Sequence, residues 1–217
     1  MKGGVEQTKT EIFLFRHGKT EANENHLYCG KTDLPLSEKG RAELLEKKES
    51  CVYPDISHCK VFTSGLKRTS QSLGILYPEI GSFGTEPSFQ EIDFGDFEMK
   101  SYEELKNDER YKAWVEREVD RIQNVYQTEA ENPCPNGESW LQMKNRVLFA
   151  LENALKNYRS VTIFTHGGPI SAIMAHFFPD ERKSMYEWQS DFGEGYKITI
   201  SENRCFYEKI PLERCES

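Results

Sequence analysis

The sequence contains no apolar run that approaches the roughly 20 residues of a membrane-spanning helix. Its opening segment, Met1–Thr10, is polar and lacks the hydrophobic stretch of a secretory signal peptide. Basic residues are fewer than acidic ones, with 28 Lys and Arg against 36 Asp and Glu. The formal net charge of −8 argues against a broad nucleic-acid-binding surface. We therefore expect a cytoplasmic protein that contacts neither membranes nor nucleic acids.

Paired cysteine motifs are also absent. The six cysteines have no Cys-x-x-Cys spacing, and the five histidines include no His-Glu-x-x-His segment, so no zinc motif is recognisable. An even number of cysteines in a chain of this size is weak support for disulfides, and reduced thiols of a cytosolic protein explain them better. We expect no metal site.

Short runs rich in β-branched and aromatic residues recur along the 217 residues, with helical patterns between them. The predicted strands are Glu11–Arg16, Lys60–Thr63, Gly84–Pro87, Val161–Thr165, Tyr196–Ser201 and Arg204–Ile210. Strands that alternate with helices favour a mostly parallel sheet covered on both faces. We predict a single α/β domain over residues 1–217, with three α/β/α layers and about six strands.

Capping residues mark two of the predicted helix starts. Ser37 is a suitable N-cap, and Ser139 with Gln142 forms a capping-box pattern. The predicted helices are Glu38–Lys48, Leu66–Leu76, the segment from Ser139 to about Tyr158 and the segment from Ile170 towards His176.

The segment from Ser101 to Glu131 is charged and aromatic, unlike its surroundings. We predict a helical cap insertion over about residues 101–131 that covers the functional site. An ordinary solvated insertion is the alternative, and the composition does not separate the two.

One apolar run ends in a chemically distinctive way. Ile12–Phe15 has the length and composition of a buried strand, and it stops at Arg16, His17 and Gly18. In open α/β sheets, ligands bind at the loops that leave the carboxyl ends of strands. A cation and an imidazole delivered there, beside a glycine that permits close backbone approach, suit an anionic substrate. A loop histidine is often simply solvated, so these three residues indicate a functional site only if other motifs in the sequence support it.

A second strand repeats this arrangement near the other end of the chain. Val161–Thr165 is followed by His166 and Gly167. Two strand-end histidines far apart in the sequence converge if their strands lie side by side. Arg68, in the first turn of the predicted Leu66–Leu76 helix, can reach the same sheet edge. Two independent strand-to-helix turns and a surface arginine are the alternative.

Together these segments resemble the histidine phosphatase superfamily, the phosphoglycerate-mutase-like group. The motifs that carry the resemblance, in the family's order, are Arg16-His17-Gly18, Ser64-Gly65-Leu66-Lys67-Arg68-Thr69, Glu91-Ile92-Asp93-Phe94-Gly95 and Thr165-His166-Gly167-Gly168. The resemblance implies a metal-independent phosphomonoesterase without a cofactor, which cleaves a small-molecule phosphate ester through a phosphohistidine.

The predicted roles follow from the resemblance and from phosphate chemistry. Arginine forks match phosphate oxygens, a neutral imidazole can attack phosphorus, and a second imidazole can donate to the oxygens that gain charge in the transition state. The predicted catalytic residues are His17, Glu91 and His166; the phosphate-binding residues are Arg16, Arg68, Asn23 and Gly167; the substrate-binding residue is Gly30.

Two of these assignments have alternatives. The residues alone leave Glu91, Asp93, Asp96 and Glu98 open as the general acid that protonates the leaving group, and the resemblance selects Glu91. For Asn23, a helix or turn cap is the alternative role.

The reaction is less closely defined by the sequence. Mutases of this superfamily carry a Tyr-Gly-Gly-Leu type segment after the acid and a paired-arginine loop, whereas this chain has Phe94–Glu98 and separated arginines. It therefore resembles the phosphatase branch, α-ribazole phosphatases most, and α-ribazole 5'-phosphate becomes a candidate substrate. The alternatives are a 2,3-bisphosphoglycerate-dependent phosphoglycerate mutase and a phosphate-ester-binding pseudoenzyme. Met99 stands where the family usually has glycine, and Gly65 where a larger residue is common. The oligomeric state is not indicated.

Overall fold

The computed structural model describes residues 9–115, 133–202 and 204–213. At its centre lies a six-stranded sheet in the order β4-β3-β5-β1-β6-β7. The strands of this sheet are β1 Thr10–Arg16, β3 Lys60–Thr63, β4 Gly84–Thr85, β5 Ser160–Thr165, β6 Gly195–Ser201 and β7 Arg204–Ile210. A separate antiparallel pair joins β2, Cys51–Val52, to β8, Leu212–Glu213.

The sheet is mostly parallel, as predicted. β1 pairs in parallel with β5, β5 with β3, and β3 with β4. β6 is antiparallel to β1, and β7 is antiparallel to β6, so β6 is the strand of this sheet that runs against the others. The parallel arrangement brings the carboxyl ends of β1, β3 and β5 to one edge.

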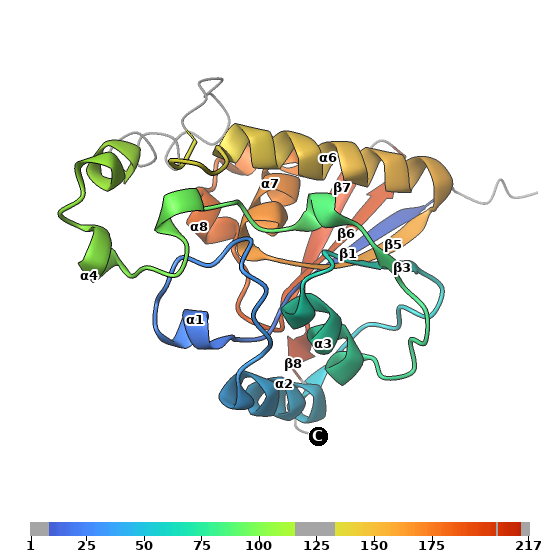
Figure 1. Cartoon of the computed structure of the whole chain (residues 1–217). Helices are drawn as coiled ribbons and strands as arrows, with labels where there is room; N and C mark the ends of the chain where they lie inside the picture. The colour runs from blue at the N-terminus through green and yellow to red at the C-terminus, as the bar shows by residue number, and fades with distance from the viewer. Residues whose placement is uncertain (1–8, 116–132, 203, 214–217) are drawn as a thin grey trace, which may run out of the picture.

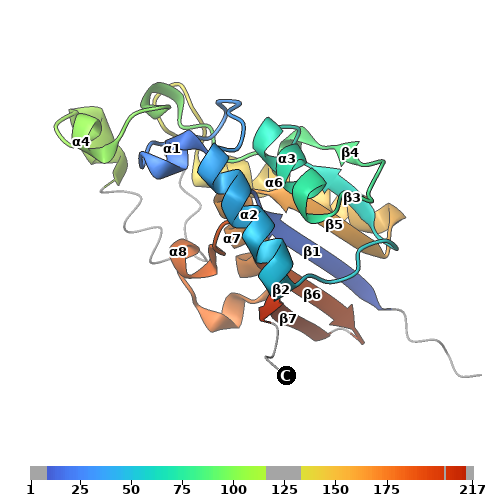
Figure 2. The ribbon, with the colours of Figure 1, turned by 90° about the horizontal axis from the view of Figure 1, so that it is seen from below.

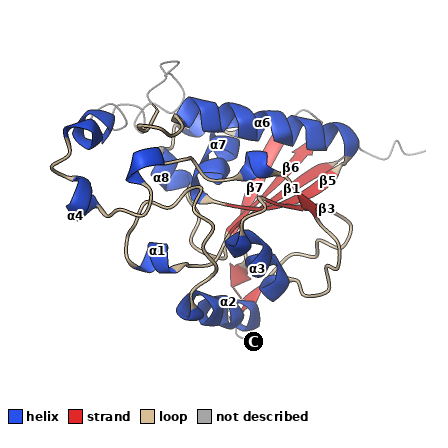
Figure 3. Cartoon of the chain, viewed as in Figure 1, coloured by secondary structure: helices blue, strands red, loops and turns tan. Residues whose placement is uncertain are grey.

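Helices cover both faces of the sheet, with α6 and α7 on one side and α2 and α3 on the other (Figures 1 and 2). Secondary-structure colouring shows the three layers, with strands between two sets of helices (Figure 3). The α-helices are α1 Glu21–Glu24, α2 Glu38–Ser50, α3 Lys67–Leu76, α4 Tyr102–Leu105, α6 Trp140–Asn157, α7 Gly167–Phe177 and α8 Met185–Trp188. The 3₁₀ turns are η1 Pro87–Phe89, η2 Gly95–Phe97 and η3 Pro179–Glu181. No helix in the described ranges has both the length and the hydropathy needed to cross a membrane.

The uninterrupted apolar run of β1 reflects burial on both faces. Ile12 and Leu14 belong to the core under α6 and α7, whereas Phe13 and Phe15 pack in a second core with residues of α2 and α3. All four side chains are at most 2% exposed. A strand with helices on both faces has no polar side, which explains why its sequence does not alternate.

The predicted caps are present, and the boundaries differ only at a few ends. The Ser37 hydroxyl accepts the N–H of Gly40, and Ser139 forms the expected capping box with Gln142. The predicted strand Gly84–Pro87 stops at Thr85, because Pro87 has no N–H for a strand ladder and instead opens η1. The last predicted helix begins at Gly167 rather than Ile170.

The structure describes the first half of the predicted cap insertion. It contains α4 and a helical stretch over residues 109–115, and the rest of the insertion, residues 116–131, lies outside the described residues. Leu105 and Tyr111 are buried in a small core with Phe97 and Cys134. This half is therefore packed against the η2 loop, while its role as a cap stays a prediction.

Candidate active site

The two strand-end histidines meet at the carboxyl edge of the sheet. β1 and β5 are paired so that Arg16 lies opposite Thr165, and His17 and His166 are the next residues. The N–H of His17 donates to the carbonyl of Thr165 at 3.1 Å, and the two imidazole centroids are 4.9 Å apart. The convergence expected from parallel neighbouring strands is present.

His17 is held as a neutral imidazole with one nitrogen directed by the backbone. Its Nδ1 lies 2.6 Å from the carbonyl oxygen of Gly18, which can only accept, so Nδ1 carries the proton and Nε2 keeps its lone pair. The side chain is 5% exposed. Burial first, and then the cation of Arg68, lower the pKa of His17 well below 6.5. His17 is therefore uncharged at neutral pH.

His166 is completely buried and also neutral. Its Nδ1 accepts a hydrogen bond of 3.3 Å from Nε of Arg68, so its proton lies on Nε2, which is 2.9 Å from Oγ of Ser64. Burial, the charge of Arg68 and the neighbouring His17 lower the pKa of His166 well below 6.5. The pair thus has one imidazole lone pair, on Nε2 of His17, and one imidazole N–H, on Nε2 of His166, which lies against Ser64.

The two arginines are anchored differently. Arg68, in the first turn of α3, is 1% exposed, and besides His166 it donates to the carbonyls of Thr32 at 2.8 Å and Gly30 at 2.6 Å. Arg16 donates from Nη1 to the carbonyl of Ser190 at 2.7 Å and lies over the ring of Phe192, 4.1 Å from its centroid.

Of these two side chains, Arg16 has the greater donor capacity left for a ligand. Its Nε is buried and has no partner within the described part of the chain. Burial lowers the pKa of Arg16, the charges of Glu91 and Asp191 oppose this shift, and the guanidinium remains a cation. Ser190 and Phe192, which hold Arg16, were not among the predicted site residues. They follow no motif or capping pattern that would have marked them.

Glu91 is bound to the start of α7. Its Oε2 accepts the N–H of Gly168 at 3.1 Å, and its Oε1 accepts the N–H of Ile92 at 3.0 Å. The glycine is required for this contact, because a Cβ at position 168 would lie 2.2 Å from Oε1 of Glu91. Gly167, one of the four predicted phosphate-binding residues, is the first residue of α7, so its N–H has no acceptor within the helix.

The three rival carboxylates have structural partners elsewhere. Asp93 pairs with Lys31, and Asp96 pairs with Arg110. Glu98 accepts backbone N–H groups of the 30–32 loop, including that of Gly30 at 2.8 Å. Among the four candidates, Glu91 is the carboxylate that contacts the α7 start beside the histidines.

The other two predicted positions have clear local roles. Asn23 accepts both the N–H and the hydroxyl of Thr20 at 3.0 Å, which is the capping role that was the alternative reading of this residue, and its amide nitrogen is left for a ligand. Gly30 is buried where a Cβ would lie 1.8 Å from the carbonyl oxygen of Ile92. It therefore permits close packing of the loop that receives Arg68, and a direct substrate contact stays a prediction.

The two departures from the family pattern have opposite backbone consequences. Gly65 has φ +87° and Met99 has φ +58°. Glycine suits the left-handed region, whereas methionine is strained there. The larger residue that is common at position 65 would be strained in the same way, and the methionine at 99 takes up a turn that favours glycine.

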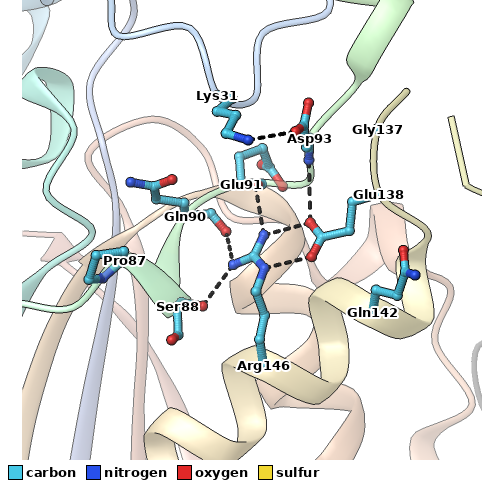
Figure 4. A pocket seen from close by; sticks show the side chains of 10 residues that line it. All are labelled: Lys31, Pro87, Ser88, Gln90, Glu91, Asp93, Gly137, Glu138, Gln142 and Arg146. Carbon is cyan, nitrogen blue, oxygen red and sulfur yellow. Dashed lines mark hydrogen bonds and ion pairs between the residues drawn. The ribbon is translucent and has the colours of Figure 1, made fainter. Parts of the chain in front are cut away.

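A cavity of about 420 Å³ opens beside Glu91 (Figure 4). Its lining residues are Lys31, Pro87, Ser88, Gln90, Glu91, Asp93, Gly137, Glu138, Gln142 and Arg146. No three His, Cys, Asp or Glu side chains gather to hold a metal ion in the described ranges. The prediction that the chemistry needs no metal continues to rest on the sequence.

Comparison with known proteins finds relatives of two kinds. The chain is 25% identical over 197 residues to the adenosylcobalamin/α-ribazole phosphatase of Escherichia coli K12, covering 88% of this chain and 90% of that protein. It is 29% identical over 172 residues to the 2,3-bisphosphoglycerate-dependent phosphoglycerate mutase of Rhodopseudomonas palustris, covering 75% and 78%.

The fold has close counterparts among solved structures. The α-ribazole phosphatase of Shigella flexneri superposes with a TM-score of 0.74 at 24% identity, covering 95% of this chain and all of that one. The family model of the histidine phosphatase superfamily (branch 1) matches residues 12–211, which include every motif described above. The chain belongs to the histidine phosphatase superfamily, branch 1.

Proposed function

We propose that this chain is a phosphomonoesterase that hydrolyses a small-molecule phosphate ester through a phosphohistidine on His17. The observation that carries the proposal is the buried, neutral His17, whose Nδ1 is tied to the Gly18 carbonyl and whose Nε2 lone pair is available. A nucleophile in this state needs no proton removed before it attacks phosphorus.

In the first step, Nε2 of His17 forms a bond to phosphorus and the ester P–O bond breaks. Arg16, Arg68 and the N–H of Gly167 supply positive charge and donors for the phosphoryl oxygens. The Nε2–H of His166, which lies 2.9 Å from Oγ of Ser64 in the structure, turns to these oxygens and stabilises the negative charge that gathers on them in the transition state. Glu91, in its protonated form, gives its proton to the departing alkoxide, so the product leaves as an alcohol.

In the second step, water replaces the alcohol. Glu91, now ionised, accepts a proton from the water as the oxygen attacks phosphorus and the P–N bond breaks. Inorganic phosphate departs, and His17 returns to its neutral state. The same carboxyl group thus serves as acid and then as base.

For the substrate, we propose an ester of the α-ribazole 5'-phosphate type. The support is the similarity to α-ribazole phosphatases over nearly the whole chain, together with the Phe94–Glu98 segment in place of a mutase-type sequence. A phosphoglycerate mutase is the second candidate, favoured by the 29% identity to a mutase. A phosphate-ester-binding pseudoenzyme is the third, and the buried, neutral His17 with its available lone pair argues against it.

A panel of phosphate esters tests the proposal. We expect release of inorganic phosphate from p-nitrophenyl phosphate and, with a higher kcat/KM, from α-ribazole 5'-phosphate, and no release by His17→Ala. Conversion of 3-phosphoglycerate to 2-phosphoglycerate that depends on 2,3-bisphosphoglycerate would establish the mutase instead. Binding of these esters without any turnover would establish the pseudoenzyme.

A further inference from the structure

Arg146, on α6, lines the cavity beside Glu91 and has no part in the steps above (Figure 4). Its Nη1 donates to the carbonyls of Ser88 and Gln90, both at 2.8 Å, and its Nη2 donates to the carbonyl of Glu91 at 2.9 Å. Its Nε and Nη2 also pair with the carboxylate of Glu138 at 2.7 and 2.8 Å. All five N–H groups of the guanidinium are therefore used within the protein.

The carbonyls of Gln90 and Glu91 need this partner. Both residues lie between η1 and η2, outside any helix or strand, so no backbone ladder satisfies them. Arg146 supplies their hydrogen bonds from a rigid support, because its neighbours on α6, Met143 and Val147, are fully buried in the core.

Glu138 extends the contact to the other side of Glu91. Besides pairing with Arg146, its carboxylate accepts the N–H of Asp93 at 3.4 Å, and its own N–H donates to the Asp93 carbonyl at 2.8 Å. The Arg146–Glu138 pair thus holds the backbone from Ser88 to Asp93. This backbone carries the Glu91 side chain, whose carboxyl group accepts the N–H of Gly168 at 3.1 Å.

We propose that Arg146 is a positioning residue for the general acid: by holding the Glu91 backbone, it fixes the Glu91 carboxyl group against the leaving oxygen. This inference rests on the proposed acid role of Glu91. A displacement of about 1 Å at a reacting group costs on the order of 10²-fold in rate. Loss of Arg146 should therefore harm the step in which Glu91 donates its proton, and most of all for poor leaving groups.

The test compares first-step rates under single-turnover conditions for an alkyl ester, glycerol 2-phosphate, and for p-nitrophenyl phosphate. The variants are Glu91→Gln, Arg146→Ala, the double variant and the control Lys156→Ala, which removes a cation from the exposed end of the same helix. We expect Arg146→Ala to lose about 10²-fold with the alkyl ester and much less with the nitrophenyl ester. In the Glu91→Gln background, Arg146→Ala should add no further ester-selective loss, and Lys156→Ala should match the wild type.

Added guanidinium ion should restore part of the alkyl-ester rate to Arg146→Ala, an effect that a general loss of folding would not show. Should Arg146→Ala fail to fold, Glu138→Gln carries the same comparison, with a smaller loss of the same selectivity. Suppose that Glu91→Gln slows the first step mainly for the alkyl ester, but the Arg146 or Glu138 variant slows it equally for both esters. That result would overturn this inference alone. Equal losses already in Glu91→Gln would overturn the acid assignment, and this inference with it.

Discussion

The Nε of Arg68 donates a hydrogen bond of 3.3 Å to Nδ1 of His166. An arginine can only donate, so Nδ1 must accept and the single proton of neutral His166 must lie on Nε2. A side chain from the start of α3 therefore selects the tautomer of a histidine at the end of β5. The donor N–H of His166 is therefore on Nε2, which lies 2.9 Å from Oγ of Ser64.

The phosphohistidine itself is the first prediction. Rapid quenching after mixing with ³²P-labelled ester should give a protein adduct that is stable to base and labile to acid, because a phosphoramidate bond hydrolyses readily when protonated. The adduct should be missing from His17→Ala. An acid-stable adduct, or unchanged turnover by His17→Ala, would contradict the mechanism.

Arg16 and Arg68 should both matter for turnover, but Arg68 alone should also matter for stability. Arg16→Ala and Arg68→Ala should each lower kcat/KM by a factor that corresponds to about 3 kcal/mol, equally for all phosphate esters, because we propose that both arginines bind the phosphoryl group that these esters share. Arg68→Ala should also lower the free energy of unfolding by about 1–3 kcal/mol, since it leaves the buried carbonyl of Gly30 and its neighbour Thr32 unpaired.

The control for this pair is Lys67→Ala, which removes a well-exposed cation beside Arg68 and should change neither quantity. The checks are steady-state kinetics and urea titrations of the same four proteins. A defect limited to one ester would mean that the arginine contacts the leaving group instead.

Stability should decline as the pH falls below about 6.5. Burial lowers the pKa values of His17 and His166 in the folded protein, so the unfolded chain takes up these two protons first and becomes favoured. The decline continues until the pH reaches the lowered folded-state pKa values. Each histidine contributes up to about 1.4 kcal/mol per pH unit over that range.

Urea titrations between pH 7 and pH 5 check this. His166→Gln should show a shallower decline than the wild type, while His26→Asn, at an exposed position with φ +54° that suits asparagine, should keep the wild-type slope. Identical slopes in all three proteins would show that the buried histidines do not control this part of the pH dependence.

Two glycine substitutions should affect different properties: Gly168→Ala should lower turnover, and Gly74→Ala should raise stability. Gly168→Ala places a Cβ 2.2 Å from Oε1 of Glu91, so the carboxyl group must move and turnover of alkyl esters should fall by about 10²-fold. Gly74→Ala, on the exposed side of α3 with no atom within 4 Å, should raise the free energy of unfolding by roughly 0.8–1 kcal/mol without changing turnover. Full activity in Gly168→Ala would argue that Glu91 needs no fixed position.

Met99→Gly should stabilise the protein by roughly 0.5–1 kcal/mol. The left-handed backbone at position 99 strains methionine, and the benefit of relieving this strain exceeds the extra chain entropy of glycine. Gly95→Ala should instead destabilise the protein, because φ at this position is +51° and a Cβ would lie 2.2 Å from the carbonyl oxygen of Pro135. Thermal unfolding of both variants gives the comparison, and a lower Tm for Met99→Gly would count against the strain.

Much of the fold could be predicted because its signals are local. A strand buried on both faces reads as a continuous apolar run, as Ile12–Phe15 does, and hydroxyl caps such as Ser37 and Ser139 announce helix starts. The pairing of β2 with β8 had no such signal, because strands of two residues are too short for any periodicity.

The residues of the candidate site also fall into those that the sequence could predict and those that it could not. His17 and His166 could be found because each follows a recognisable strand, and parallel pairing then brings them together. Arg146 could not, because its partners are carbonyls of a segment distant in sequence, and its own position on an amphipathic helix is unremarkable. Glu91 was separated from its rivals by the family resemblance. Its contact with the Gly168 N–H sets it apart from the other three carboxylates, and its role as the acid stays a prediction.

The position of β1 has a consequence for how the protein is made. β1 is synthesised first, but both of its neighbours in the sheet, β5 and β6, come from the last part of the chain. At ordinary translation rates, on the order of ten seconds pass between the synthesis of this apolar segment and the synthesis of β5, the first of its two partner strands. We expect the nascent chain to depend on chaperones during this time, and any fragment that stops before Ser160 to aggregate.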